Sequence, residues 1–413
     1  MAQLNTRHIA LCLAAAFALS ACAGTGGQFG SDFATPGEGT GTGLQQSIDG
    51  LPPANGRIIG KGSVRVALLV PSSAQGFGAL AAENFANAAD LAIREFGEDT
   101  INIVVKDTAG SPQGAANATR EALSEGAELI LGPVFSNSVP AAAGVARPSG
   151  VPILAFSNSN SIASRGVNIF GFTPEPGIER AIRHAGETGS RSFAALLPNN
   201  ALGTLAEAAF RQSVPRAGGR IVQVARYNYE NDDPRVKAQE IGSLVASGQI
   251  DTVFIPDAGD IAPQLVTAVK QAVPQGKPVK FVGSGQWDDP RIFRNPALEG
   301  SIYAAPDRSG YNAFAQRYNA AFGKPPIRLA SLAYDATSLL IVLSQNFPDD
   351  KFSQSRLTSR SGFKGTADGT FRISGNGRVE RSLAVYEVTA TGPQIVSPAA
   401  TSFAQPTAAA TGN

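Results

Sequence analysis

The central part of the chain alternates short apolar runs with longer stretches that carry apolar residues at helical spacing. The first run, 64–70 (VRVALLV), precedes the stretch 79–96, in which Leu80, Phe85 and Leu91 recur near one helical face. Continuous apolar and β-branched runs without polar alternation are typical of strands that are buried on both faces of a parallel sheet. The pattern therefore predicts an α/β protein with helices on both sides of its sheets.

The alternation repeats often enough to build two lobes. Strands are expected at 64–70, 101–107, 129–132 and 152–156 in the first set and at 193–198, 220–227, 252–257 and 279–284 in the second. Helices are expected at 79–96, 112–125 and 138–147 in the first set and at 202–216, 234–247 and 261–273 in the second. Two further helices (311–322 and 329–345) and short strands near 371–373 and 382–388 are too few for a third domain, so we expect them to complete two doubly wound lobes.

The N-terminal residues read as an export signal. Arg7 and His8 precede an apolar run at 9–19 that is too short to span a hydrocarbon core of about 30 Å. The run ends in Leu-Ser-Ala-Cys at Cys22, which resembles the bacterial lipobox. The resemblance implies a signal peptide at 1–21, acylation of Cys22 with palmitate-type chains and, because Ala23 follows, sorting to the outer membrane. The alternative is a soluble secreted protein with a coincidental cysteine.

Two segments lack the residues needed for a core. Residues 23–60 hold 11 glycines and few large apolar residues, so we expect a flexible tether with a mean span of about 35 Å. Residues 398–413, rich in Ala, Thr and Ser, are expected to form a disordered tail. The folded domain is thus predicted at 61–397.

Charge and residue usage remove several classes of function. The chain has 34 Lys and Arg against 33 Asp and Glu, so there is no excess positive charge for a nucleic-acid partner. Beyond Cys22 it contains one histidine, His184, and no cysteine. Zinc sites built from Cys and His, cysteine nucleophiles and internal disulfides are therefore excluded from the expected domain, and we expect neither a metal nor a cofactor.

The remaining enzyme motifs are incomplete. Residues 76–81 fit G-x-G-x-x-A but lie beyond the end of the first strand, and 361–364 fit S-x-x-K without the S-D-N or K-T-G partners. His184 falls inside an expected helix, where a catalytic triad would not place it. Asp288 and Asp289 are adjacent, which is typical of a turn and a helix cap. The sequence therefore predicts that the protein is not an enzyme.

Seven segments, taken in order, resemble a known family. They are EGAELILGPVFSNSV (125–139), SGVPILAFSNSNSIASRGV (149–167), FGFTPEPGIERAIRHA (170–185), FAALLPNNALGTLAEAAF (193–210), FVGSGQWDDP (281–290), FGKPPIRLASLAYDA (322–336) and FRISGNGRVERSLAVYEV (371–388). Their order is similar to the type I periplasmic binding protein fold of the branched-chain amino-acid (leucine-binding-protein-like) receptors. Closer still is the resemblance to the penicillin-binding protein activator lipoproteins.

The resemblance implies where the chain passes between the lobes. Three crossovers are expected, near 172–176, 303–306 and 346–352. The first lobe would then hold 61–172 and 306–346, and the second 177–303 and 352–397.

A ligand cleft is expected at the carboxyl ends of the strands, where ligands bind in open α/β sheets. Ser136, Asn137, Ser157 and Asn158 occupy positions similar to those with which the amino-acid receptors hold a ligand's carboxylate and amine. The other interpretation is that these side chains are helix N-caps and loop stabilisers.

The second lobe departs from the receptor pattern. Leu202 stands where those receptors stack an aromatic ring, and the acid that binds the ligand's amine has no clear match in GSGQWDDP. Asp257 and Trp287 remain candidate cleft residues, although Trp287 could equally be a packing residue.

These observations predict a non-catalytic lipoprotein, anchored in the outer membrane and facing the periplasm. The resemblance implies that it binds and activates a penicillin-binding protein that synthesises peptidoglycan. The alternative is a solute-binding lipoprotein of an ABC importer for amino acids or related small molecules. A small molecule in the cleft is compatible with either role, and the incomplete second lobe favours the first.

Overall fold

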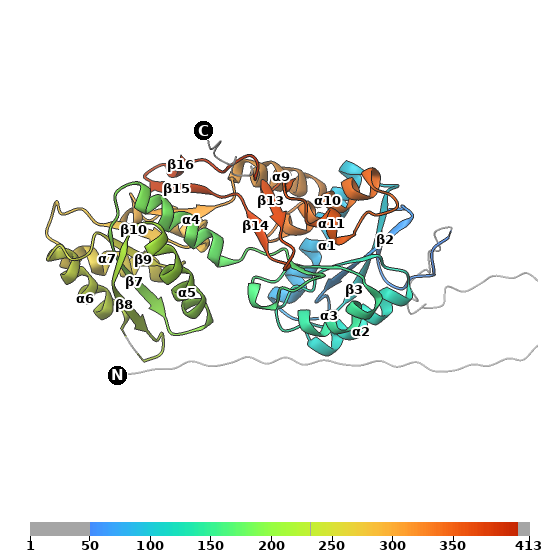
Figure 1. Ribbon diagram of the computed structural model, residues 1–413, viewed down its shortest axis with the longest axis horizontal. Coiled ribbons are helices and arrows are strands. Elements are labelled where there is room, and N and C mark those ends of the chain that lie inside the picture. The colour runs from blue at the N-terminus through green and yellow to red at the C-terminus, as the bar shows by residue number, and fades with distance from the viewer. Residues whose placement is uncertain (1–49, 232, 404–413) are drawn as a thin grey trace, which may run out of the picture. The chain divides into compact units, whose positions relative to one another are not determined.

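The computed structural model describes residues 50–231 and 233–403, all of which belong to one compact unit (Figure 1). The expected signal peptide, Cys22 and most of the expected tether lie outside the described residues.

Lobe 1 is built on a six-stranded sheet with the order β1-β3-β2-β4-β5-β6. The strands are β1 (Ile58–Ile59), β2 (Val64–Val70), β3 (Ile101–Asp107), β4 (Leu129–Leu131), β5 (Ile153–Ala155) and β6 (Val167–Ile169). All neighbours are parallel except β1, which runs antiparallel to β3 at the edge.

Helices cover both faces of this sheet (Figure 1). Val66, Leu68 and Val70 face α1 (Phe77–Phe96), α9 (Arg308–Phe322) and α10 (Ala330–Asn346). Ala67 and Leu69 face α2 (Pro112–Ser124) and α3 (Val139–Ala146) instead. Because successive side chains point to opposite faces, a strand covered on both sides is expected to be largely apolar, as β2 is from Val66 to Val70.

Lobe 2 has a seven-stranded sheet with the order β16-β15-β11-β10-β9-β7-β8. Its strands are β7 (Ser192–Pro198), β8 (Arg220–Tyr227), β9 (Thr252–Ile255), β10 (Lys280–Gly283), β11 (Ile302–Ala305), β15 (Ala384–Thr389) and β16 (Gly392–Ser397). The five strands from β7 to β11 are parallel, and the last two add antiparallel neighbours at one edge.

Lobe 2 is also covered on both faces. Phe193 and Leu197 pack with α4 (Pro174–Glu187) and α5 (Ala201–Arg216). Leu196 packs on the other side with α6 (Pro234–Ala246) and α7 (Ile261–Ala272). The predicted fold class, α/β with two doubly wound lobes, is confirmed.

The chain leaves lobe 1 after β6, returns to it between β11 and α9, and leaves it again much later than expected. Residues 352–381 form α11 (Gln354–Leu357) and a small antiparallel sheet of β12 (Phe363–Lys364), β13 (Thr370–Ile373) and β14 (Val379–Arg381). Phe352, Leu357, Phe371 and Val379 join the core of lobe 1. The expected third crossover at 346–352 is therefore wrong. The chain instead enters lobe 2 between Arg381 and Ala384. The sequence did not predict this, because a strand pattern does not reveal which core its apolar side chains join.

The boundary of the tether also needs correction. Ile58 and Ile59 pair with Val104 and Ile103, and Ala54 is buried. The main-chain carbonyl of Pro52 accepts a hydrogen bond from Arg65. Residues 51–60 therefore belong to lobe 1. Composition did not predict this, because a short edge strand barely changes the composition of a glycine-rich segment.

The start of the expected tail contacts the domain as well. Thr370 donates a hydrogen bond to the Thr401 carbonyl, at 3.1 Å, and the Arg372 guanidinium lies over the Phe403 ring. Residues 404–413 lie outside the described part of the chain.

Candidate ligand-binding site

The four candidate residues of lobe 1 come from two loops at the carboxyl ends of neighbouring parallel strands. Ser136 and Asn137 follow β4, and Ser157 and Asn158 follow β5. The Ser136 and Ser157 hydroxyl oxygens lie 2.8 Å apart, which joins the two loops directly. The structure therefore brings Ser136 and Ser157 into direct contact at this edge of the sheet.

Helix N-capping does not account for Ser136 and Asn137. α3 takes Ser138 as its N-cap and receives no side-chain cap hydrogen bond, so Ser136 and Asn137 do not cap it. Ser157 does stabilise its own loop, since its hydroxyl accepts the Ser159 N–H at 3.2 Å. Asn158 is exposed.

An acidic side chain from β3 lies at the same edge of the sheet. The Asp107 carboxylate accepts hydrogen bonds from the Ser73 N–H, at 3.2 Å, and the Ala109 N–H, at 2.9 Å. Partial burial alone would raise the pKa of Asp107, but these hydrogen bonds hold it below its ordinary value. The loops after β2 and β3 are thereby tied to each other.

In lobe 2 the candidate Asp257 is already engaged by protein groups. It follows β9, is 6% exposed, and accepts hydrogen bonds from the Tyr227 and Tyr229 hydroxyls, the latter at 2.6 Å. Burial, together with the charge of Asp257, raises the pKa values of both tyrosines, so both remain protonated donors. Each carboxylate oxygen of Asp257 therefore has a phenolic partner.

Trp287 is fully buried. Its indole N–H donates to the main-chain carbonyl of Asp257 at 2.6 Å, and its ring lies against Gly283 of β10, where an added Cβ would come within 2.0 Å of the ring. The structure thus favours the packing interpretation of Trp287 over a role in ligand contact.

Sequence reasoning missed Tyr227 and Tyr229 as members of this group. They lie at the end of β8, which is separated from β9 by β7 in the sheet order. The available signal was an aromatic pair, Tyr-x-Tyr, where the edge strand β8 meets its carboxyl-end loop. Among residues 50–231 and 233–403, no hydrogen bond or ion pair joins the candidate residues of lobe 1 to Asp257 or Trp287.

The residues weighed for catalysis have structural surroundings. Asp289 caps α8 (Pro290–Phe293) by accepting the Arg291 N–H at 2.8 Å, and Asp288 pairs with Arg308 at 2.8 Å. His184 lies within α4, 3.9 Å from Glu187. The described residues contain no group of three or more His, Cys, Asp or Glu side chains placed to hold a metal, and none of their helices is long and apolar enough to cross a membrane.

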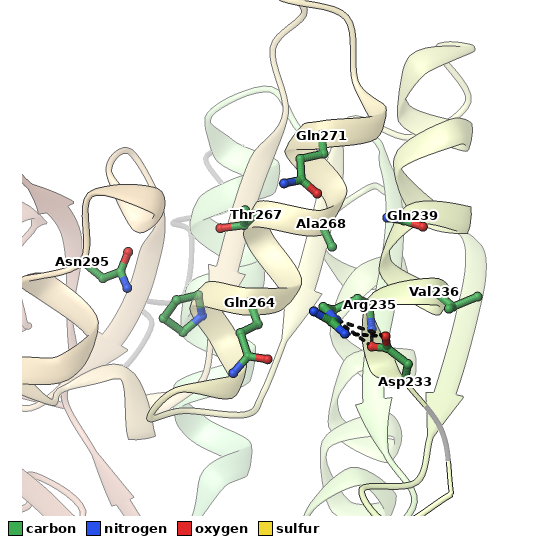
Figure 2. Close-up of a pocket in the computed structure, with 10 residues that line it drawn as sticks. Asp233, Arg235, Val236, Gln239, Gln264, Thr267, Ala268, Gln271 and Asn295 are labelled. Carbon is green, nitrogen blue, oxygen red and sulfur yellow. Dashed lines mark hydrogen bonds and ion pairs between the residues drawn. The ribbon is translucent and has the colours of Figure 1, made fainter.

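A hollow of about 580 Å³ lies between α6 and α7 of lobe 2 (Figure 2). Its lining is rich in amides, with Gln239 on α6 and Gln264 and Gln271 on α7, and Asp233 and Arg235 form an ion pair at one side. None of the predicted site residues lines it.

Comparison with solved structures agrees with this architecture. The chain is similar to a branched chain amino acid ABC transporter periplasmic ligand-binding protein of Burkholderia xenovorans LB400, with a TM-score of 0.66 and 16% identity over 81% of this chain and 95% of that one. It is also similar to an ABC transporter substrate-binding protein of Desulfitobacterium hafniense in complex with Leu, with a TM-score of 0.60 and 17% identity over 81% and 99%. At this identity the likeness establishes the fold.

A curated relative matches part of the sequence. It is the penicillin-binding protein activator LpoA of Pantoea ananatis, 30% identical over 131 residues, and the match takes in 32% of this chain but only 19% of that protein. Residues 63–393 match the family model described as periplasmic binding protein. The chain therefore belongs to the periplasmic binding protein family, and its fold is the leucine-binding-protein-like type I fold.

Proposed function

We propose that this chain is a non-catalytic envelope lipoprotein that binds a peptidoglycan-synthesising penicillin-binding protein and stimulates it. The partial likeness to an activator supports this role, and the family and fold are those of binding proteins. The observation that favours this role over solute transport is the hydrogen bonding of Asp257. Both oxygens of this nearly buried carboxylate already accept tyrosine hydroxyls.

The engagement of Asp257 weakens the case for an amino-acid receptor. A ligand's ammonium group would have to share the carboxylate with Tyr229 or displace its hydroxyl, and a hydrogen bond to a charged group contributes about 1.5–3 kcal/mol. Trp287 offers no surface to a ligand, because its side chain is fully buried. Of the two candidate residues of lobe 2, Asp257 is therefore not a free acid and Trp287 is not an exposed ring.

The family and the partial likeness indicate an envelope protein. Anchoring through an acylated Cys22, with sorting to the outer membrane, is part of the proposal and rests on the Leu-Ser-Ala-Cys motif. Residues 23–50 would then link the anchor to lobe 1. A glycine-rich segment of that length has a mean span of about 30 Å, which would let the domain meet a partner away from its own membrane.

A second function, solute binding for an ABC importer, is favoured by one observation. The Ser136 and Ser157 hydroxyls lie together at the carboxyl edge of lobe 1, where they could hold a ligand's carboxylate. The Desulfitobacterium hafniense structure with this fold binds Leu.

The experiment that tests the proposal combines the purified protein with a penicillin-binding protein from the same envelope. Glycan synthesis from the lipid-linked precursor is measured with and without the chain, and we expect the rate to rise in proportion to complex formed. Ser157→Ala with Asn158→Ala serves as the matched variant and should stimulate equally, because activation uses an outer surface. Absence of both binding and stimulation would contradict the proposal, and tight binding of an amino acid would then favour the importer.

A further inference from the structure

A second hollow lies in lobe 1, at the opposite end of the short strand β5 from the candidate ligand residues. It has a volume of about 610 Å³, and we call it the amino-edge pocket because β5 and β6 begin at it. Its lining comes from the end of α3 and the turn after it, from the starts of β5 and β6, and from 352–354 at the start of α11. The candidate residues Ser157 and Asn158 follow the opposite, carboxyl end of β5.

The pocket's volume lies within the roughly 300–1,000 Å³ that small-molecule sites occupy. Much of its lining is apolar, comprising Ala143, Ala146, Val151, Pro152, Ile153, Val167 and Phe352. Such a lining favours a ligand with an apolar body.

The polar side chains that line the pocket include two arginines and the hydroxyls of Ser164 and Ser353, and Ser164 accepts a long hydrogen bond from Arg147, at 3.5 Å. Arg147 and Arg165 line it, and neither guanidinium has a carboxylate partner in the described part of the chain. The Gln354 side-chain N–H₂ is shielded from solvent and has no hydrogen-bond partner there. Because a shielded atom is out of reach of a molecule in the pocket, the exposed Arg147 and Arg165 are the charged side chains that a ligand would meet there.

Acidic groups do not offset these donors. No Asp or Glu lines the pocket. Of the acids on nearby segments, Glu128 is paired with Lys351 at 2.8 Å and Asp350 with Arg356 at 3.2 Å, while Asp349 is exposed and does not line the pocket. The pocket is thus apolar in its body and cationic at its rim.

We propose that the amino-edge pocket binds a small organic carboxylate that carries an apolar body. The carboxylate pairs with Arg147 and Arg165, because guanidinium groups match carboxylates geometrically and carry a permanent charge. The apolar body packs on Val151 and Phe352. This site does not depend on the proposed function, and it can be filled while the candidate residues at the carboxyl edge are free or occupied.

The test uses octanoate as the probe and a chain beginning at Gly43, which holds the whole compact unit. Isothermal titration calorimetry measures binding to the wild type, to Arg147→Gln with Arg165→Gln, and to Arg120→Gln with Arg216→Gln. The last pair removes the same charge from exposed sites on α2 and α5. We expect the first double variant to bind octanoate at least tenfold more weakly and the control to stay within twofold. Neutral 1-octanol should bind the wild type at least tenfold more weakly than octanoate.

Two further variants test whether octanoate binds in the amino-edge pocket or at the carboxyl edge of the sheet. Gln354→Glu should weaken octanoate binding, because it adds a negative charge to the pocket lining, and Ser157→Val should leave the affinity unchanged. Matching thermal midpoints verify that each variant is folded. Absence of octanoate binding to the wild type would overturn the proposal. Equal binding by the two double variants, or loss of binding in Ser157→Val, would overturn it too.

Discussion

The guanidinium of Arg328 lies 2.8 Å from the carboxylate of Asp368, a side chain that is completely buried. Arg328 also stacks over the rings of Phe172 and Tyr311, with 4.6 and 4.4 Å to the ring centroids. Phe172 belongs to the first crossover, and Asp368 belongs to the small sheet that leads to the last. One arginine therefore links two of the segments through which the chain passes between its sheets.

Replacing Arg328 by methionine should lower the free energy of unfolding by about 3 kcal/mol, because it leaves Asp368 as a buried charge that has lost its ion-pair partner. Equilibrium unfolding in urea measures this. Lys324→Met is the matched control, since Lys324 pairs with Glu83 through side chains that are both about half exposed. An exposed pair contributes less than about 1 kcal/mol, so equal losses in the two variants would refute the assigned role of Asp368.

Asp335, next to this pair, should make stability depend on pH in the opposite direction to an ordinary ion-paired acid. Burial, and then the charge of Asp368, raises the pKa of Asp335 to about 6. Its unfolded value is near 3.8, so between those pH values the folded state binds more protons than the unfolded state. The contribution of this carboxyl to stability therefore falls as pH rises from about 4 to about 6 and stays low above that.

The comparison with Asp335→Asn isolates that contribution. Asn keeps an oxygen for the Thr366 and Ala367 N–H groups, which donate to Asp335 at 2.9 Å each, but does not ionise. Relative to the wild type, the variant should gain on the order of 2–3 kcal/mol of unfolding free energy between pH 4 and 6.5. A difference that does not change with pH would show that Asp335 is ionised throughout this range.

Much of the fold follows from periodicity. The strands at 64–70, 101–107 and 220–227 match the structure residue for residue, because each is a stretch rich in β-branched residues that is bounded by a turn or loop. The Ser136–Ser157 contact was predictable as well, since the two loops follow adjacent parallel strands at one edge of the sheet.

Other features depend on contacts between distant segments. The hydrogen bonds from Tyr227 and Tyr229 to Asp257 require knowledge of strand order, because β7 lies between the strands that carry them. The late third crossover depends on which core accepts Phe371 and Val379. Local hydrophobic spacing predicts neither the strand order nor the core that Phe371 and Val379 join.

Residues 51–60 should contribute to stability, contrary to the expectation from composition. A chain that begins at Lys61 loses β1 and exposes the surface that Ala54 and Ile59 cover. The buried Lys106 ammonium also loses the Asn55 carbonyl, 2.7 Å away. We expect the free energy of unfolding to fall by about 2–5 kcal/mol relative to a chain that begins at Gly43. Thermal and urea unfolding measure this, and equal midpoints would show that the segment adds nothing.

Cys22→Ser should abolish acylation, because Cys22 ends the Leu-Ser-Ala-Cys motif. Metabolic labelling with a palmitate analogue tests this, and the variant should accumulate with its signal peptide attached and take up no label. Cys12→Ser removes a cysteine within the signal sequence and should be labelled like the wild type. Label retained by Cys22→Ser would place the lipid elsewhere.

The free amino acids leucine, isoleucine and valine should stabilise the domain little. A ligand present at a hundredfold excess over its Kd adds about 2.7 kcal/mol to the free energy of unfolding. An amino acid would gain lobe 1 contacts at Ser136 and Ser157, but in lobe 2 it would meet a carboxylate already occupied by Tyr229, at 2.6 Å. Thermal unfolding with millimolar amino acid should therefore show no increase of that size. An increase with leucine that disappears in Ser157→Ala with Asn158→Ala would show that the carboxyl-edge residues grip a solute, and it would favour transport over activation.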